Sequence, residues 1–583
     1  MGSNTRHRRN STQRGSGHPP GLVAALVVLC VTLAAAACSS GEDAAEGAGA
    51  TTAPESNAGS GETEEGETNG AETDQDDPVE EPTDTEVERE PTDPAMVEVE
   101  SGELIGTVDG PVRTFLAVPY ADSPAGEGRW KAPRPHPGWS EPLKANEVGA
   151  ACTQIGGITS DFVIAEGGSD EDCLTLDVFG PSEAEAAPVM VWFHGGGFTG
   201  GTAHSVLYEG TNIADEGVVL VNVNYRLGAF GFLVTDELVE EGDGPVGNYG
   251  LQDQVAALEW VNRNIEQFGG DPDNVTIFGQ SAGGFSVCAH LASDRSAGLF
   301  HRAIIQSGGD CGRSTPLDTA GPGGEAPATE FGSGWVGASP CADDPSLECL
   351  RALSAEEIIA TSTEFGEDGF GEVLDGEVLA TTALQMAEED RLPDVEIMTG
   401  SNLDEGSLFL LTADVPDAAV LTERVVAAIP DGVDAAEVLT LYQDGFETDK
   451  DRLIALQSDL SFGCGAIDFA REAADDTEVF TYYFTRRSPD DPFGVGATHG
   501  AELVYVFGNP GGIAGLGEIG EADTTIGDRM RDRWVGFAAN GSPGVWTSYD
   551  PSDPAILHID EVDTEETTLN EDRCAALAEI GVR

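Results

Sequence analysis

The stretch Val275-Thr-Ile-Phe-Gly-Gln-Ser-Ala-Gly-Gly284 joins a strand pattern directly to a helix pattern. Its first four residues are apolar or β-branched, as in a buried strand, and residues 282–292 continue with helical spacing. Between them Gly279-Gln-Ser-Ala-Gly283 matches G-x-S-x-G, a sharp turn that exposes a serine oxygen at the end of a strand. The helix N-terminus offers free N–H groups to a developing negative charge. Ser281 is therefore the candidate nucleophile, and the alternative is a plain strand-to-helix turn with a capping serine.

The sequence on both sides of this stretch alternates between strand and helix patterns. Residues 188–193 and 218–224 are continuous apolar runs, suited to strands buried on both faces. Residues 251–268 repeat apolar side chains at helical spacing. Further strands are predicted at residues 302–305, 395–399 and 479–484. The alternation predicts the α/β class, with a mostly parallel central sheet and helices on both faces.

A glycine loop follows the strand predicted at residues 188–193. The sequence His194-Gly-Gly-Gly-Phe198 lets backbone N–H groups of Gly196 and Gly197 point into one spot. Together with the N–H of Ala282 they would form a three-donor oxyanion hole. His194 itself is expected to be structural, because it precedes the donors. The alternative is a flexible glycine turn with no role in catalysis.

With these motifs in place, the sequence resembles the type-B carboxylesterases, which include cholinesterases and bacterial para-nitrobenzyl esterases. The resemblance runs from about residue 102 to residue 549, and it implies the α/β-hydrolase fold and hydrolysis of carboxylic esters. Its markers are Phe115-Leu-Ala-Val-Pro-Tyr-Ala121, Glu171-Asp-Cys-Leu-Thr-Leu-Asp177, Asn224-Tyr-Arg-Leu-Gly228, Gly247-Asn-Tyr-Gly-Leu-Gln-Asp253, Phe268-Gly-Gly-Asp-Pro272 and Gly279-Gln-Ser-Ala-Gly-Gly284.

The resemblance supplies the two partners of Ser281. Asn402-Leu-Asp-Glu-Gly406 resembles the family's acid motif, which implies Glu405 as the catalytic carboxylate. The segment of residues 498–508 resembles its histidine motif and implies His499 as the base. From the residues alone, His499 is one of nine histidines and Asp404 rivals Glu405. The order serine, acid, histidine is that of α/β-hydrolases, and the implied acyl-enzyme reaction needs neither a metal nor an organic cofactor.

The charge balance restricts the partners of this protein. Acidic residues outnumber basic ones 105 to 28, which gives a formal net charge of -77. Such a protein repels the phosphates of nucleic acids and gains no attraction from an anionic membrane surface. We expect a solvated acidic surface, and the presence of only three lysines (Lys131, Lys144 and Lys450) also fits adaptation to high salt. The expected partner is a small-molecule ester, and nothing in the sequence indicates an oligomeric state.

The N-terminal segment predicts export. Residues 1–37 combine four arginines with an uncharged run that ends in small residues, as an export signal does. Ala35-Ala-Ala-Cys38 resembles a bacterial lipobox, in which Cys38 becomes lipidated and tethers the protein to a membrane. Cleavage with release, or an uncleaved anchor, are the alternatives. Residues 38–96 are acidic and poor in apolar residues, which predicts a disordered linker, and residues 97–583 are the predicted catalytic domain.

Ten cysteines occur, and all but Cys30 and Cys38 lie in the predicted catalytic domain, where export favours disulfides. The resemblance suggests the pairs Cys152–Cys173 and Cys341–Cys349. Cys288, in the helix after the nucleophile, is expected to be a buried free thiol. A bridge between Cys311 and Cys464 is a further hypothesis, and Cys574 has no expected partner.

Two departures from the cholinesterase pattern bear on the substrate. Residues 152–173 contain no tryptophan, and Gln280 precedes the nucleophile where cholinesterases have glutamate. A cation–π site for choline is therefore not expected. Esters are the predicted substrates, with amides, carbamates and lactones as alternatives for the same triad. A relative that uses the fold only for binding is the competing class, and the intact serine and glycine motifs disfavour it.

Overall fold

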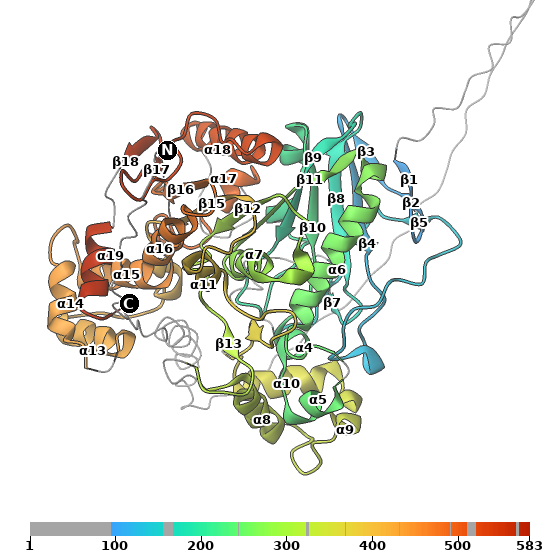
Figure 1. Cartoon of the computed structure of the whole chain (residues 1–583), viewed down its shortest axis with the longest axis horizontal. Helices are drawn as coiled ribbons and strands as arrows, with labels where there is room; N and C mark the ends of the chain where they lie inside the picture. Colours follow the sequence, from blue (N-terminus) through green and yellow to red (C-terminus); the bar gives the residue numbers. More distant parts are fainter. Residues whose placement is uncertain are drawn as a thin grey trace, which may run out of the picture. The chain divides into compact units, whose positions relative to one another are not determined.

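The computed structural model describes residues 95–155, 167–242, 244–321, 326–367, 369–430, 432–489, 491, 493–509, 520–566 and 571–582. These residues belong to one compact unit, drawn in colour in Figure 1. The expected export signal and nearly all of the expected linker lie outside the described residues. Ala95 is buried and Met96 opens the first strand, so these two residues belong to the folded unit and not to the linker.

An 11-stranded sheet forms the centre of the fold. The neighbouring strands from β10 through β9 to β17 are all parallel, as the alternating pattern predicts. The two edges are antiparallel, which the sequence pattern does not indicate. In spatial order the strands are β18 (Thr564–Glu566), β17 (Ile556–Ile559), β16 (Val479–Phe484), β15 (Glu396–Asn402), β12 (Arg302–Gln306), β11 (Gly270–Gln280), β9 (Ala187–Phe193), β10 (Val219–Val223), β8 (Thr175–Pro181), β4 (Val112–Pro119) and β3 (Thr107–Asp109).

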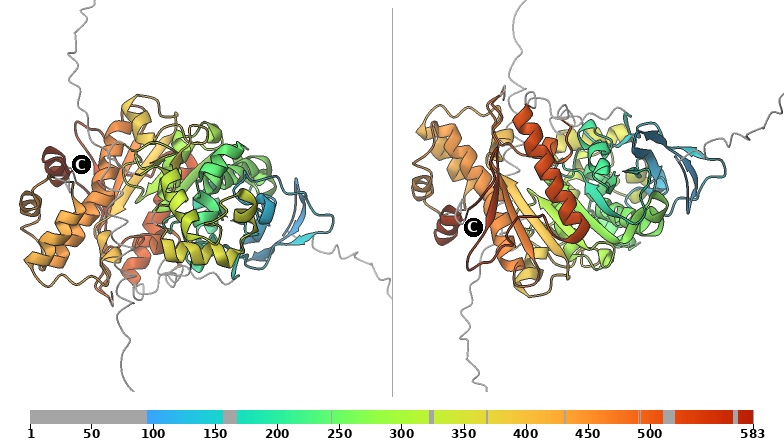
Figure 2. Two further views of the ribbon diagram at one scale, coloured as in Figure 1. Left: turned by 90° about the horizontal axis from the view of Figure 1, so that it is seen from below. Right: turned by 90° about the horizontal axis from the view of Figure 1, so that it is seen from above.

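Helices cover both faces of this sheet (Figure 2). Successive side chains of β9 point to opposite faces, so that Val191 joins the apolar core beneath α6 and α7 while Trp192 joins the core beneath α18. The helices are α3 (Thr211–Asp215), α4 (Gly228–Phe232), α5 (Asp236–Glu241), α6 (Tyr249–Asn264), α7 (Ala282–Ala292), α8 (Ala328–Ala338), α9 (Leu347–Ala352), α10 (Ala355–Phe365), α11 (Ala383–Glu388), α12 (Gly406–Phe409), α13 (Ala418–Ala428), α14 (Ala435–Leu441), α15 (Asp449–Ser458), α16 (Cys464–Ala473), α17 (Leu503–Val506), α18 (Glu521–Asn540) and α19 (Glu571–Glu579).

Smaller pieces of sheet lie beside the central one. One of them is a two-stranded parallel ribbon of β13 (Thr315–Pro316) and β14 (Val373–Leu374). Helices α8 to α10 lie between these two strands along the chain. The others are a sheet of β1 (Met96–Val99), β2 (Gly102–Ile105) and β5 (Leu143–Lys144), and a pair of β6 (Ala151–Cys152) with β7 (Ser169–Asp170).

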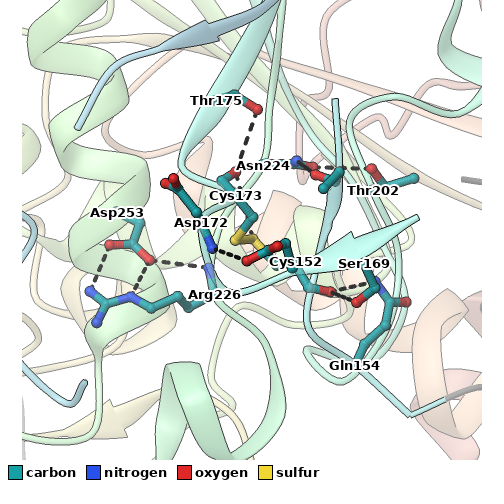
Figure 3. Close-up of a disulfide and its surroundings, with 12 residues drawn as sticks. Cys152, Gln154, Ser169, Asp172, Cys173, Thr175, Thr202, Asn224, Arg226 and Asp253 are labelled. Carbon is teal, nitrogen blue, oxygen red and sulfur yellow. Dashed lines mark hydrogen bonds and ion pairs between the residues drawn. A yellow bond between two sulfur atoms is a disulfide. The ribbon is translucent and has the colours of Figure 1, made fainter. Parts of the chain in front are cut away.

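Four disulfides cross-link the described residues. Cys152–Cys173 and Cys341–Cys349 are the pairs that the resemblance suggests. Figure 3 shows Cys152–Cys173 beside the buried ion pair of Arg226 and Asp253, whose two contacts measure 2.7 Å each.

The expected states of the other four cysteines are wrong. Cys288 is not a free thiol, because it bonds to Cys311. Strands β11 and β12 are neighbours, so the loop after β12 lies beside the helix after β11. The hypothesis of a Cys311–Cys464 bridge therefore fails. Cys464 at the start of α16 bonds instead to Cys574 of α19, which packs against that helix.

The cross-links bear on the compartment of the protein. Disulfides persist in oxidising environments, so four of them indicate an exported protein. Within the described ranges, no helix is long and apolar enough to cross a membrane.

Candidate active site

The turn at Ser281 has the geometry that its motif predicts. Ser281 lies between the end of β11 and the start of α7, with φ 57° and ψ −123°. This is a strained conformation for a residue with a Cβ atom, and such strain is typical of functional turns. A Cβ atom on Gly283 would lie 1.9 Å from the backbone oxygen of Phe193, and one on Gly279 would lie 2.3 Å from that of Gly283. Both glycines are therefore required for the close approach.

His499 and Glu405 meet beside this turn. Nδ1 of His499 lies 2.5 Å from Oε2 of Glu405, whose side chain is completely buried just after β15. The imidazole packs against the rings of Phe409 and Phe462, at centroid distances of 5.2 and 4.7 Å. The structure thus brings the predicted acid and base into direct contact from two distant segments of the chain.

Two donors hold the other oxygen of Glu405. The hydroxyl of Ser307 donates to Oε1 at 2.6 Å, and the backbone N–H of Asn402 donates to it at 2.7 Å. Asp404, the rival acid, forms a two-contact ion pair with Arg487 at 2.6 and 2.7 Å. The carboxylate that faces the histidine is therefore that of Glu405. Ser307 is a site residue that sequence reasoning missed.

The glycine loop after β9 lies against the serine turn. A Cβ atom on Gly195 would come within 3.1 Å of the Cβ atom of Ser281. Gly196 and Gly197 both have positive φ, at 120° and 65°. A Cβ atom on Gly196 would lie 2.0 Å from the backbone oxygen of Gly200, so only glycine fits there.

His194 at the start of this loop is a buried structural group. Its ring stacks on Tyr225 at a centroid distance of 4.4 Å, and its Nδ1 lies 2.9 Å from the oxygen of Gly195. Burial lowers the pKa of His194 to about 4, so the ring is neutral at neutral pH.

Comparisons with known proteins agree with this site. The model of the carboxylesterase family matches residues 93–577. The chain belongs to the carboxylesterase family.

Its relatives include several esterases. It is 32% identical over 499 residues to para-nitrobenzyl esterase of Bacillus subtilis, covering 82% of this chain and 97% of that protein. It is 34% identical over 475 residues to fumonisin B1 esterase of Sphingopyxis macrogoltabida, covering 77% and 83% respectively. A solved PNB esterase structure superposes with a TM-score of 0.73 at 30% identity, covering 83% of this chain and 99% of that one. This carboxylesterase is therefore a serine ester hydrolase with the α/β-hydrolase fold, as the sequence motifs predict.

A buried acid that sequence reasoning missed lies behind the triad candidates of this carboxylesterase. Glu502 is completely buried and accepts hydrogen bonds from Gln306 (3.1 Å) and from the side-chain amide of Asn402. Burial and the charge of Glu405 raise the pKa of Glu502 to about 7. The only sequence signal for this residue is its place three positions after His499, within the histidine motif.

Proposed function

We propose that this carboxylesterase cleaves its ester substrates through a catalytic triad of Ser281, His499 and Glu405. The observation that supports it is the 2.5 Å contact between Nδ1 of His499 and the buried Glu405, beside the strained serine turn. With Nδ1 bound to a carboxylate, the proton acceptor of the neutral ring is Nε2.

The proposed reaction has two halves. As the oxygen of Ser281 attacks the ester carbonyl, His499 takes the hydroxyl proton and then gives it to the leaving alcohol. Water next attacks the acyl-enzyme, loses a proton to His499, and the carboxylic acid leaves as Ser281 regains its hydrogen. Glu405 stabilises the imidazolium in both halves. Every proton and acyl transfer is thereby assigned to these side chains, so the scheme uses no metal or organic cofactor.

We assign the oxyanion hole to the backbone N–H groups of Gly196, Gly197 and Ala282. Two observations support this choice. The glycine loop lies against the serine turn, and Ala282 is the first residue of α7, so its N–H has no acceptor within the helix. These donors would stabilise the negative oxygen of each tetrahedral intermediate.

The experiment uses the full chain and follows hydrolysis of p-nitrophenyl butyrate at low and high salt. Ser281→Ala should lower kcat/KM by at least roughly a thousandfold, because the acyl-enzyme cannot form. A fluorophosphonate probe should label the unaltered protein at Ser281 and leave the variant unlabelled. Ser286→Ala is the matched control, since Ser286 is a buried serine of α7 that bonds to Gln254. Equal rates in folded wild type and Ser281→Ala would exclude the triad.

We further propose that export is followed by lipidation of Cys38, so that a membrane-tethered catalytic domain acts outside the cytoplasm. The disulfides support export, and the Ala35-Ala-Ala-Cys38 sequence supports the lipid. Mass spectrometry of the N-terminal peptide tests this directly. Cys38→Ser should abolish both the mass of the lipid and detergent-dependent extraction. A free, unmodified N-terminus after residue 37 would contradict it.

A further inference from the structure

The small ribbon of β13 and β14 ends beside the proposed active site. Thr315 pairs with Val373, and the backbone N–H of Thr315 donates to the oxygen of Glu372 at 2.9 Å. Arg313 and Glu372 therefore enter the ribbon at the same end. A Cβ atom on Gly371 would lie 3.5 Å from the ring of Phe198, the residue that follows the glycine loop.

Arg313 lies over the first turn of the nucleophile helix. Its guanidinium carbon is 5.4 Å from the ring centre of Phe285, and the N–H of Phe285 donates to the oxygen of Ser281 at 2.9 Å. A Cβ atom on Gly309 would lie 3.3 Å from the Phe285 ring and 3.4 Å from the oxygen of Ser461. Ser461 precedes Phe462, whose ring centre is 4.7 Å from that of His499, so Gly309 lies between the ring under Arg313 and the segment that contacts the proposed base.

Among the residues that the structure describes, the charge of Arg313 has no direct partner. Its half-buried guanidinium forms no hydrogen bond or ion pair with any described residue, whereas Arg226 and Arg486 each bond to a carboxylate. Asp310 and Glu372 act on Arg313 only through their charge. Although burial lowers the pKa of Arg313, a guanidinium stays protonated at neutral pH.

Glu372, close to Arg313, also has an unsatisfied polar atom. Its carboxyl is buried, and Oε1 has no hydrogen-bond partner among the described residues. Burial raises the pKa of Glu372 well above its usual range, because the charged carboxylate is poorly solvated there. A buried carboxyl oxygen without a hydrogen bond, next to a cation without a counter-ion, costs free energy unless a ligand supplies the missing partners.

We propose that Arg313, with Glu372 beside it, binds a carboxylate of the substrate, so that this enzyme prefers esters carrying a negative charge. The inference rests on the proposed triad, because it places the carboxylate relative to Ser281. A guanidinium matches a carboxylate with two parallel hydrogen bonds, and Phe285 supports its flat face. Such recognition also explains an unpaired arginine in a chain where acids outnumber bases 105 to 28.

The test compares charged esters with uncharged esters of the same shape, using the full chain and titration of released acid. Monoethyl succinate against ethyl 4-methylpentanoate places the charge on the acyl side. Butanoyloxyacetate against isobutyl butanoate places it on the alcohol side. Arg313→Met keeps the contact with Phe285 and removes the charge. It should lower kcat/KM for one charged ester by roughly 10- to 100-fold and change its neutral counterpart less than about threefold. The charged ester that loses activity shows whether Arg313 binds a carboxylate on the acyl side or on the alcohol side of the substrate.

Arg263→Met is the matched control, since Arg263 is an exposed arginine paired with Glu100. It should leave all four substrates unchanged within about twofold. If Arg313→Met does not fold, competitive inhibition of the unaltered enzyme by succinate tests whether the site binds a carboxylate. Inhibition in roughly the millimolar range supports the site. Equal losses for charged and neutral esters in Arg313→Met, or no inhibition by succinate, would overturn the proposal. Failure of the triad is separate, because it appears as turnover that survives Ser281→Ala.

Discussion

The side-chain amide nitrogen of Gln280 lies 3.1 Å from Nε2 of His499. This is the nitrogen that takes the proton of Ser281 in the proposed mechanism. Because Nδ1 is bound to Glu405, Nε2 is an acceptor in the neutral ring, and Gln280 donates to it. The residue before the nucleophile therefore acts on the base, which its position in the sequence did not indicate.

Replacing this amide by a carboxylate should shift the pH dependence of the enzyme. In Gln280→Glu a negative charge about 3 Å from Nε2 would favour the protonated ring, which cannot accept the serine proton. We expect the acid limb of the kcat/KM profile for p-nitrophenyl butyrate to move to higher pH by roughly one unit. Activity at pH 6 should fall while activity at pH 9 is largely retained.

Gln443→Glu is the control, because Gln443 is exposed and its side chain bonds to Thr440, far from His499 in the sequence. Its profile should overlay that of the unaltered enzyme. An unshifted acid limb in Gln280→Glu would mean that the amide does not contact the working form of the base.

Glu502 should make the stability of the protein decrease as pH rises. In the unfolded chain its carboxyl titrates near the ordinary value for glutamate, whereas burial and Glu405 raise its pKa to about 7 in the fold. Between these values the folded state binds the extra proton, so the free energy of unfolding falls with increasing pH. A shift from about 4.5 to about 7 corresponds to roughly 3 kcal/mol at most.

Urea unfolding of the full chain at pH 5 and pH 8 measures this effect. Glu502→Gln cannot ionise, so its loss of stability between the two pH values should be smaller than that of the unaltered protein by up to about 3 kcal/mol. Any constant penalty from the altered hydrogen bonds cancels in this comparison. Glu447→Gln, at an exposed position, should behave like the parent. Parallel pH dependences in the parent and Glu502→Gln would show that Glu502 titrates normally.

The centre of the fold was predictable because its signals are local. The runs that became β9 and β10 are apolar on both faces, and the serine turn joins β11 to α7 within ten residues. The antiparallel edge strand β3 is exposed throughout, so no hydrophobic pattern marks it. The buried strands β8 and β17 were not predicted either, so the local signals located the middle of the parallel sheet and missed strands toward both edges.

The site was only partly predictable, because its contacts join distant segments. Asp404 and Glu405 look alike in the sequence, and only the family motif and then the ion pair with Arg487 separate them. The pairing of Cys288 depends on the adjacency of β11 and β12, which spacing does not encode. No motif in the sequence marks Arg313, and only the ribbon places it over Phe285.

The corrected cysteine pairs predict unequal contributions to stability. Cys288–Cys311 closes a separation of 23 residues and Cys464–Cys574 one of 110 residues. Loop entropy then predicts that double replacement by alanine costs about 3 kcal/mol for the first pair and about 5 kcal/mol for the second. Guanidinium unfolding of the two double variants gives the comparison, with Cys341→Ala/Cys349→Ala as a short-loop control at about 2.5 kcal/mol. Peptide mapping without reduction should recover both links, and a Cys311–Cys464 peptide would refute this pairing.

The acidic surface predicts a protein that salt stabilises. With a formal net charge of -77, like charges repel across the folded chain, and this repulsion is relieved when the chain expands on unfolding. Raising sodium chloride from about 0.05 M to about 1 M shortens the Debye length from over 10 Å to about 3 Å and screens that repulsion. The thermal midpoint of the full chain should rise by on the order of 5 °C. Sucrose is the control solute, because it stabilises proteins by exclusion from their surface and does not screen charge. In added sucrose at constant low salt, the repulsion between the acidic residues should persist, so a further rise of the midpoint on adding sodium chloride is still expected. A midpoint that falls with added salt would show that attractive ion pairs, such as Arg487 with Asp404, outweigh the net repulsion.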